Sequence, residues 1–192
     1  SGSGSAYVFV RSGSTWTQQQ KIVAGDRAAD DQFGTSVAIN GDHAIVGAHL
    51  QDGDAANGDP ASNAGAAYTF ARSGSTWTQQ QKMVASDRAA EDQFGTSVAI
   101  SGDHAIVGAL GEDEDALGGN TADQSGSAYI VARSGSTWTQ EQKIVALDRA
   151  AGDAFGHSVA ISGDHAIVGA YLEGEDTDGG NTAVYAGSAY IF

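Results

Sequence analysis

A stretch that occurs three times constrains the fold of this chain more than any other feature. Residues 33–48, 94–109 and 155–170 each begin with Phe-Gly and end with Gly-Ala, and successive copies start 61 positions apart. Inside each copy, Ser-Val-Ala-Ile and His-Ala-Ile-Val flank a Gly-Asp pair. Two runs rich in β-branched residues around a tight turn with glycine predict a β-hairpin. A fixed period of this length predicts a repeat protein.

Two further runs follow each hairpin, one containing Ala-Tyr and one containing Thr-Trp-Thr-Gln. We therefore expect four strands in the first complete unit, at 35–40, 43–48, 66–71 and 76–84. Buried helices have apolar residues at i, i+3 and i+4, and no segment of this chain shows that spacing. Four antiparallel strands per repeat form the blade of a β-propeller, and neighbouring blades must stack to cover their faces. The sequence predicts an all-β propeller with three 61-residue repeats.

The repeats divide a single propeller module, residues 1–192, in an uneven way. We expect two strands in 1–23, complete blades at 33–83 and 94–144, and a partial blade at 155–192. Three blades cannot close a ring, since propellers have about four or more, and an open arc would expose apolar faces. We expect the N-terminal strands of another copy to complete the partial blade in a homo-oligomer, either a six-bladed dimer or a nine-bladed trimer. The other interpretation is that the chain is part of a longer propeller.

The pattern Phe-Gly-x-Ser-Val-Ala-Ile-x-Gly-Asp-x-Ala-Ile-Val-Gly-Ala, followed by Gly-Ser-Ala-Tyr and Ser-Thr-Trp-Thr-Gln, resembles the FG-GAP repeat. It is most similar to the bacterial type, a relative of the repeats in the integrin α-subunit head, and the resemblance covers essentially the whole chain. The resemblance implies a propeller that serves in binding or adhesion and has no catalytic role. It also implies an extracellular or cell-surface location and a protein or carbohydrate ligand.

The calcium site of integrin-type repeats does not carry over to this chain. Those repeats bind calcium in a long Asp-rich loop between the first two strands. Here that connection is only Asn40-Gly41-Asp42, or Ser-Gly-Asp in the later units. It is too short to wrap a cation that needs about six to eight oxygen ligands.

Carboxylates gather instead between the second and third strand of each unit. Alternating carboxylates and glycines are what a hard-cation loop needs, but a solvated acidic loop has the same composition. Both interpretations stay open, with calcium as the candidate cofactor. The candidate ligands are Asp52, Asp54, Asp113, Asp115, Glu175, Asp176 and Asp178.

Other polar residues that recur in the repeats have simpler interpretations. The aspartates before each hairpin are expected to be turn residues paired with Arg27, Arg88 and Arg149. The glutamine run and Lys21 are expected to form a wet outer edge that discourages foreign strand pairing.

Charge and composition exclude several classes of protein. A net charge of −15 repels phosphate backbones and argues against nucleic acid as a partner. No apolar run approaches the roughly 18 residues of a membrane span. The chain has no cysteine and therefore no thiolate metal site.

Two alternatives to a binding or structural module remain. One is an enzyme with a site on the propeller's top loops, although no set of acid, base and nucleophile is unique to one repeat. The other is a designed or recently amplified repeat protein without a ligand, as the near-identity of the units suggests. The mass in solution, with and without calcium, is the most discriminating measurement.

Overall fold

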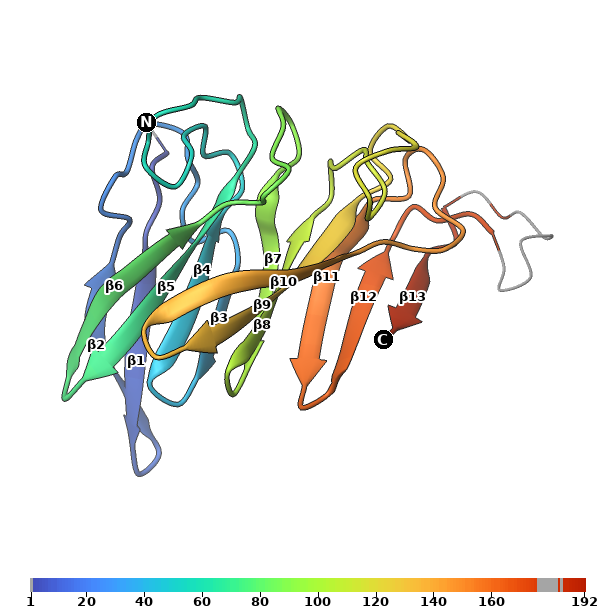
Figure 1. The fold of residues 1–192 in the computed structure, drawn as a ribbon. Helices are drawn as coiled ribbons and strands as arrows, with labels where there is room; N and C mark the ends of the chain where they lie inside the picture. The colour runs from blue at the N-terminus through green and yellow to red at the C-terminus, as the bar shows by residue number, and fades with distance from the viewer. Residues whose placement is uncertain (1, 176–182, 184) are drawn as a thin grey trace.

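The computed structural model describes residues 2–175, 183 and 185–192, and these residues form antiparallel sheets without a helix (Figure 1). The thirteen strands are β1 (Ala6–Ser12), β2 (Thr15–Ile22), β3 (Val37–Asn40), β4 (His43–Ala48), β5 (Ala66–Ser73), β6 (Thr76–Met83), β7 (Phe94–Ser101), β8 (His104–Ala109), β9 (Ser127–Ser134), β10 (Thr137–Ile144), β11 (Phe155–Ser162), β12 (His165–Ala170) and β13 (Ser188–Ile191).

The strands form four sheets in which neighbours in space are neighbours in the chain. β3–β6 make the first blade and β7–β10 the second, each with four strands. β11–β13 make a three-stranded third blade, and β1 and β2 pair as a separate N-terminal hairpin. The expected four-stranded antiparallel units are therefore confirmed. The strand bounds differ by one or two residues from those expected, and the first strand begins at Val37 instead of 35.

A buried phenylalanine opens the hairpin of each repeat and contacts two blades. In the second blade, Phe94 forms a parallel bridge with Gly65 of the first blade. Its ring packs edge-to-face on Tyr129 of its own blade, with centroids 5.3 Å apart. Phe33 and Phe155 repeat both contacts, with Gly4 and Tyr68 and with Gly126 and Tyr190. All three phenylalanines are buried, so they occupy equivalent positions in the three repeats.

Glycines lie where the inner strands of neighbouring blades touch. Ser36 Oγ donates a hydrogen bond to the Gly95 carbonyl of the next blade over 2.8 Å. A Cβ placed on Gly47 would lie 1.9 Å from that same carbonyl oxygen, which is closer than atoms can pack. The glycine of one Gly-Ala pair and the glycine of the next Phe-Gly pair therefore allow a backbone contact that side chains would prevent.

The outer strands are joined by glutamine side chains, which corrects the expectation of a wet edge. Gln20 on β2 accepts a hydrogen bond from Trp77 N over 2.7 Å and donates one to Trp77 O over 2.8 Å. Gln81 makes the same pair of bonds with Trp138 in the next blade. Both tryptophans are buried. The glutamine run therefore holds the outer strands of adjacent blades together.

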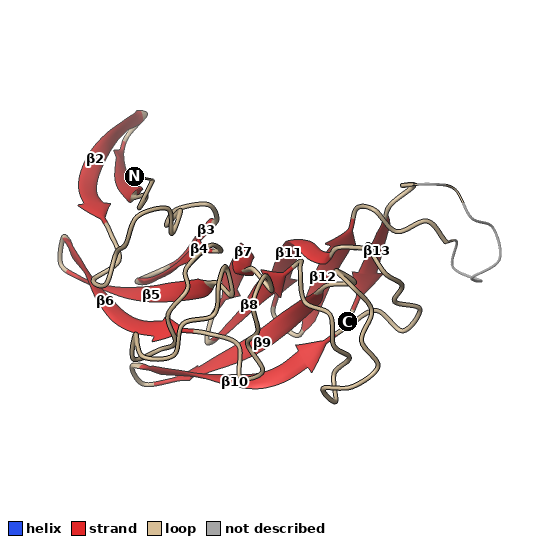
Figure 2. Cartoon of the chain, turned by 90° about the horizontal axis from the view of Figure 1, so that it is seen from above, coloured by secondary structure: helices blue, strands red, loops and turns tan. Residues whose placement is uncertain are grey.

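The sheets stand side by side in chain order, with the hairpin turns at one end and the long connections at the other (Figure 1). Seen from above, the N-terminal hairpin lies at one end of the row and β13 at the opposite end (Figure 2). The end faces carry exposed apolar side chains, among them Val37 and Ile39 at one end and Ile167 at the other. The described part of the chain has no helix with the length and hydropathy that a membrane crossing requires.

Candidate functional site

A buried lysine lies between carboxylates at the boundary of the first and second blades. Lys143 Nζ donates to Asp87 Oδ2 over 2.8 Å and also contacts Glu112 Oε2. The Tyr129 hydroxyl lies 3.0 Å from Asp87 Oδ1 and 2.5 Å from Glu112 Oε2. The lysine side chain is only 5% exposed. We call these four residues the second cluster, because β9 and β10 of the second blade carry its tyrosine and lysine.

Strand register and loop position bring the second cluster together. Tyr129 and Lys143 are direct cross-strand partners on β9 and β10. Asp87 follows β6 of the first blade, and Glu112 follows β8. The cluster therefore ties the end of one blade to three elements of the next.

Protonation within the second cluster favours an ion pair and a neutral phenol. Burial lowers the pKa of Lys143, but its hydrogen bonds and charge interactions with Asp87 and Glu112 outweigh this and raise that pKa. Burial raises the pKa of Tyr129 far above its usual value, and the charge of Glu112 adds to the rise. Lysine is therefore a cation at neutral pH, and tyrosine is a hydrogen-bond donor.

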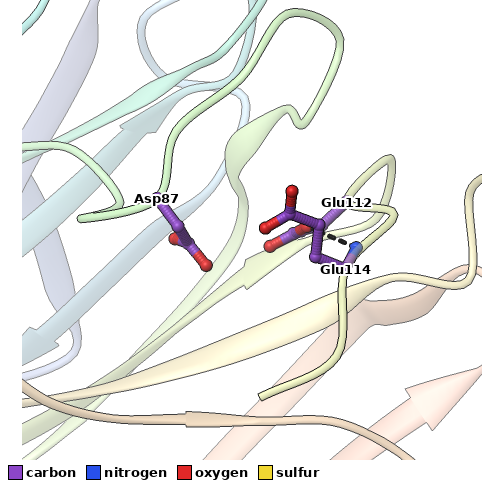
Figure 3. A group of neighbouring side chains, drawn as sticks. All are labelled: Asp87, Glu112 and Glu114. Carbon is purple, nitrogen blue, oxygen red and sulfur yellow. Dashed lines mark hydrogen bonds between the residues drawn. The ribbon is translucent and has the colours of Figure 1, made fainter. Parts of the chain in front are cut away.

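Glu114 adds a third carboxylate beside the second cluster (Figure 3). One oxygen from each of Asp87, Glu112 and Glu114 lies within 4.8 Å of the other two. The Glu114 main-chain N–H donates to Glu112 Oε1 over 2.7 Å. Such an oxygen group suits a hard cation, but Lys143 already contacts two of the three carboxylates.

Another carboxylate, that of Asp92, lies near the second cluster. Asp92 is buried, and its carboxylate accepts the Ala89 N–H over 2.5 Å. Burial, together with the charges of Glu112 and Asp87, raises the pKa of Asp92 to about 7. The expectation that this aspartate is a turn residue is confirmed by its bond to Ala89.

The first cluster has the same design with one charge fewer. Lys82 Nζ donates to Asp26 Oδ2 over 2.9 Å and to Asn57 Oδ1 over 2.6 Å. Tyr68 donates to Asp26 over 3.1 Å. Gln51 stands where the second repeat has Glu112. The amide oxygen of Asn57, and not that of Gln51, is the second partner of the lysine in place of a carboxylate.

The third cluster has its carboxylates and tyrosine but no lysine among the described residues. The Tyr190 hydroxyl donates to Asp148 Oδ1 over 2.9 Å and approaches Glu173 Oε2 at 3.4 Å. Glu173 is 1% exposed. The position equivalent to Lys143 would lie on a fourth strand, and the third blade has three.

Four of the predicted calcium ligands accept hydrogen bonds from the main chain of their own loops. Asp52 Oδ1 accepts Asn63 N–H over 2.8 Å, and Asp113 Oδ1 accepts Gln124 N–H over 2.7 Å. Asp54 accepts two main-chain N–H groups, and so does Asp115. These bonds lower the pKa of Asp54 and Asp115.

The remaining predicted ligands belong to the third repeat. Glu175 donates its main-chain N–H to Glu173 Oε1 over 2.7 Å, while Asp176 and Asp178 lie outside the described residues. Among the residues that the structure describes, the close carboxylate group of Asp87, Glu112 and Glu114 includes none of the predicted ligands.

Arg88 and Arg149 bind carbonyl oxygens of the loops between the second and third strands, and Arg27 donates to Ser3 Oγ over 2.6 Å, which corrects the expected pairing with the aspartates before each hairpin. Arg88 donates to Asp52 O over 2.6 Å and to Asp59 O over 2.8 Å. Arg149 likewise donates to the carbonyls of Asp113 and Asn120. Arg88 and Arg149 therefore occupy backbone oxygens that a cation in these loops would use.

The sequence interpretation missed the lysines of the clusters. A signal was present, because tyrosine and lysine recur at fixed repeat positions, as in Tyr68 with Lys82 and Tyr129 with Lys143. A lysine that keeps the same separation from a tyrosine in successive repeats indicates a structural contact between the two side chains. The surrounding glutamines obscured it.

Comparison with known proteins agrees with the repeat geometry. No curated protein sequence matches the chain. The FG-GAP repeat matches residues 16–70, 77–131 and 138–192. Each matched unit runs from the outer strand of one sheet to the third strand of the next, so the sequence repeat and the blade are offset. With three matches that span most of its length, and with paired glycines at each contact between inner strands, the chain belongs to the FG-GAP repeat family.

Proposed function

We propose that this chain is a non-catalytic propeller module with a binding or structural role, and that it self-assembles through hybrid blades. One observation carries the proposal. The third blade has the first three strands of a blade and lacks the fourth, whereas the N-terminal hairpin has the last two and lacks the others. Together they hold five strands, one more than a blade, so two copies make a complete four-stranded blade when one of the two third strands, β13 or β1, is displaced.

Pairing of the ionisable groups supports a non-catalytic role. Lys82 and Lys143 each have a carboxylate partner, and the same arrangement recurs at successive blade boundaries. Repeated, mutually satisfied ion pairs are typical of packing contacts, although such networks also perturb pKa values. The alternative is an enzyme at the top loops, and it would need a reactive group outside these pairs.

Ring size favours a dimer. Each copy contributes two complete blades and one hybrid blade, so two copies give six blades and three give nine. Propellers typically have about four to eight blades, and two-fold symmetry is the commonest closed arrangement of identical chains.

Light scattering at micromolar concentration tests the assembly. We expect about twice the chain mass of 19.4 kDa. Deletion of residues 1–23 removes the strands that complete the third blade and should leave a monomer. A wild-type protein that stays at 19.4 kDa would contradict self-assembly, and three times that mass would indicate the nine-bladed ring.

For the location and ligand, we propose a protein or carbohydrate partner outside the cell or at the cell surface, consistent with adhesion. Support comes from the family, whose repeats generally serve in binding or structural roles. A pull-down from cell-surface extracts with the assembled protein tests this. A protein that captures neither class of ligand would favour the amplified or designed repeat without a ligand.

We also propose weak calcium binding by the acidic loops. The support is the close approach of Asp87, Glu112 and Glu114 in the described residues and the carboxylates at 52–54 and 113–115. Binding is weak because Lys143 and main-chain N–H groups already use these oxygens. Titration calorimetry of wild type and Asp115→Ala tests it, and no heat at millimolar calcium would leave the solvated-loop interpretation.

A further inference from the structure

Among the residues that the structure describes, the third cluster contains a buried carboxylate with no cation beside it. Glu173 is 1% exposed, and its described donors are Glu175 N–H and the Tyr190 hydroxyl. The equivalent acid in the second cluster, Glu112, has Lys143. A buried carboxylate without a paired cation is costly. The third cluster is therefore an incomplete site.

The missing half of that site is present at the other end of the chain. Tyr7 and Lys21 are cross-strand partners on β1 and β2, as Tyr129 and Lys143 are on β9 and β10. Lys21, Lys82 and Lys143 stand 61 positions apart. Both Tyr7 and Lys21 are exposed, and the lysine lies over the ring of the tyrosine. The N-terminal hairpin thus presents a tyrosine–lysine half-site.

We propose that Lys21 of a second copy completes the third cluster by pairing with Asp148 and Glu173. The proposal rests on the self-assembly proposed above and names the contact that fixes its register. The occupant is a second copy of this chain. When the 61-residue spacing is continued from one copy to the next, further residues of the two end faces become partners of the kind already seen between blades.

The apolar end faces match first. Ile45 of the first blade shares a buried cluster with Val98 and Ile100 of the second. Ile106 of the second blade packs in the same way with Val159 and Ile161 of the third.

The next contact in this series joins Ile167 to Val37 and Ile39 of the second copy. In the single chain these three side chains are 40%, 60% and 58% exposed. Assembly would bury all three in the arrangement that the chain already uses twice.

The outer strands match next. Gln20 pairs with the main chain of Trp77, and Gln81 with that of Trp138. The same step places Gln142 opposite Trp16 of the second copy. Trp16 is 65% exposed, whereas Trp77 and Trp138 are buried.

A hollow marks the place of the strands that are absent from the N-terminal hairpin. It has a volume of about 610 Å³ and is lined by β1 residues such as Tyr7 and Phe9 and by Val37 and Ile39 of β3. In the hybrid blade, β11 and β12 of the second copy lie beside β1 and face this side of the first blade.

Strand β13 occupies the position that β1 of the second copy would take. β13 pairs with β12 from Ser188 to Ile191, whereas β1 pairs with β2 from Ala6 to Ser12. The β1–β2 hairpin of the second copy therefore replaces the short pairing of β13 with β12, and β2 becomes the fourth strand of the blade. In the register of β5 on β4, Ser5 lies opposite Ala170, and Tyr7 takes the place of Tyr190.

Sedimentation equilibrium of charge variants tests the contact. We expect Lys21→Met to raise the dimer dissociation constant at least about 10-fold, because it leaves a buried acid unpaired. Lys82→Met makes the same chemical change within one chain, and it should leave that constant within about threefold of wild type, since a charge pair inside each subunit is equally present in monomer and dimer. Lys21 is exposed in the single chain, so its loss does not threaten folding.

A complementation experiment supplies the positive test. Lys21→Glu alone and Glu173→Lys alone should each fail to dimerise, because like charges then meet at both interfaces. An equimolar mixture should dimerise, because both interfaces regain opposite charges. An unchanged dissociation constant for Lys21→Met, or a mixture that stays monomeric, would overturn the Lys21 contact and leave self-assembly standing. A monomeric wild type would overturn both.

Discussion

Lys143 Nζ lies 2.8 Å from Asp87 Oδ2 across the boundary between two blades. The two residues are 56 positions apart in the chain, and the pair is joined by Tyr129 and Glu112. Contact between the blades of this protein is therefore partly electrostatic, in addition to the packing of Phe94 and the inner glycines.

Replacing this lysine should destabilise the fold. Lys143→Met leaves Asp87 and Glu112 close together without a cation, and breaking a buried pair in this way typically costs about 3–5 kcal/mol. Urea unfolding followed by tryptophan fluorescence measures the loss. Glu112→Gln in the same chain should recover part of it, because it removes one of the two unpaired carboxylates and restores the neutral residue that the first repeat has at Gln51. A loss below about 1 kcal/mol would mean that the pair behaves like a surface salt bridge.

The first cluster provides an internal comparison for that prediction. Lys82→Met leaves one carboxylate, Asp26, which is 15% exposed at its side chain. We expect a smaller loss, about 1–3 kcal/mol, because fewer buried charges lose their partner. Equal losses for Lys82→Met and Lys143→Met would show that Glu112 contributes nothing to the pair.

The raised pKa of Asp92 predicts a pH dependence of stability. Its folded pKa is about 7, above the usual value of 3.8. The folded state therefore binds more protons than the unfolded state between these values, and this group costs stability as pH rises through about 7. Asp92→Asn removes the titration.

Unfolding at pH 5 and pH 8 checks the sign of that effect. The variant should gain about 1–2 kcal/mol relative to wild type between the two pH values, with allowance for solvent screening. A difference between variant and wild type that does not change with pH would show that Asp92 keeps an ordinary pKa.

Two glycines at equivalent positions should respond differently to alanine. A Cβ on Gly108 would lie 1.9 Å from the Gly156 carbonyl, so Gly108→Ala should cost about 3 kcal/mol of stability. A Cβ on Gly169 meets the rotatable Ser158 Oγ at 2.5 Å and no backbone of a following blade. Gly169→Ala should therefore leave the stability of the single chain within about 1 kcal/mol of wild type.

Gly169→Ala should have a much larger effect on assembly than on the stability of the single chain. In a hybrid blade, Gly169 would face the Phe-Gly glycine of the second copy, Gly34, as Gly47 faces Gly95. Gly169→Ala should then abolish dimerisation measured by light scattering. A fully dimeric Gly169→Ala protein would contradict the proposed geometry of the inner strands.

Removal of residues 187–192 tests whether β13 competes with the hairpin of a second copy. We expect the deletion to tighten the dimer, because the edge of β12 is then free for β1 of the second copy. Sedimentation equilibrium measures the constant, with circular dichroism as a control for folding. A weaker dimer after the deletion would mean that β13 stays in place and β2 adds beside it.

The repeat period made most of the fold predictable. Strong signals such as Phe94, the Gly-Asp turns and Trp77 recur at one spacing, so the sequence indicated the strand order and the four-stranded units. The ends of the strands were predicted less accurately. Polar residues such as Arg72 and Ser73 continue the hydrogen-bonded pairing of β5 with β6, although their polarity is typical of a turn.

The candidate site was predicted less well, for a physical reason. Asp52 and Asp115 are carboxylates in acidic loops, but their hydrogen bonds go to main-chain N–H groups, which no residue pattern reveals. Lys143 looks like a surface residue beside glutamines, yet it is buried because Asp87 arrives from the preceding blade. Contacts between repeats depend on how the blades stack. The repeat spacing alone does not tell which side chains of adjacent blades face each other.

The strands β4, β8 and β12 have one and the same sequence, His-Ala-Ile-Val-Gly-Ala. During refolding, the hydrogen-bonding edge of any of them accepts the partner strand of another repeat with the same side chains in register. Non-native pairings within one chain, and exchanges between chains, are therefore close in energy to the native ones. Refolding yield should fall as protein concentration rises, as is typical of repeat proteins that misassemble.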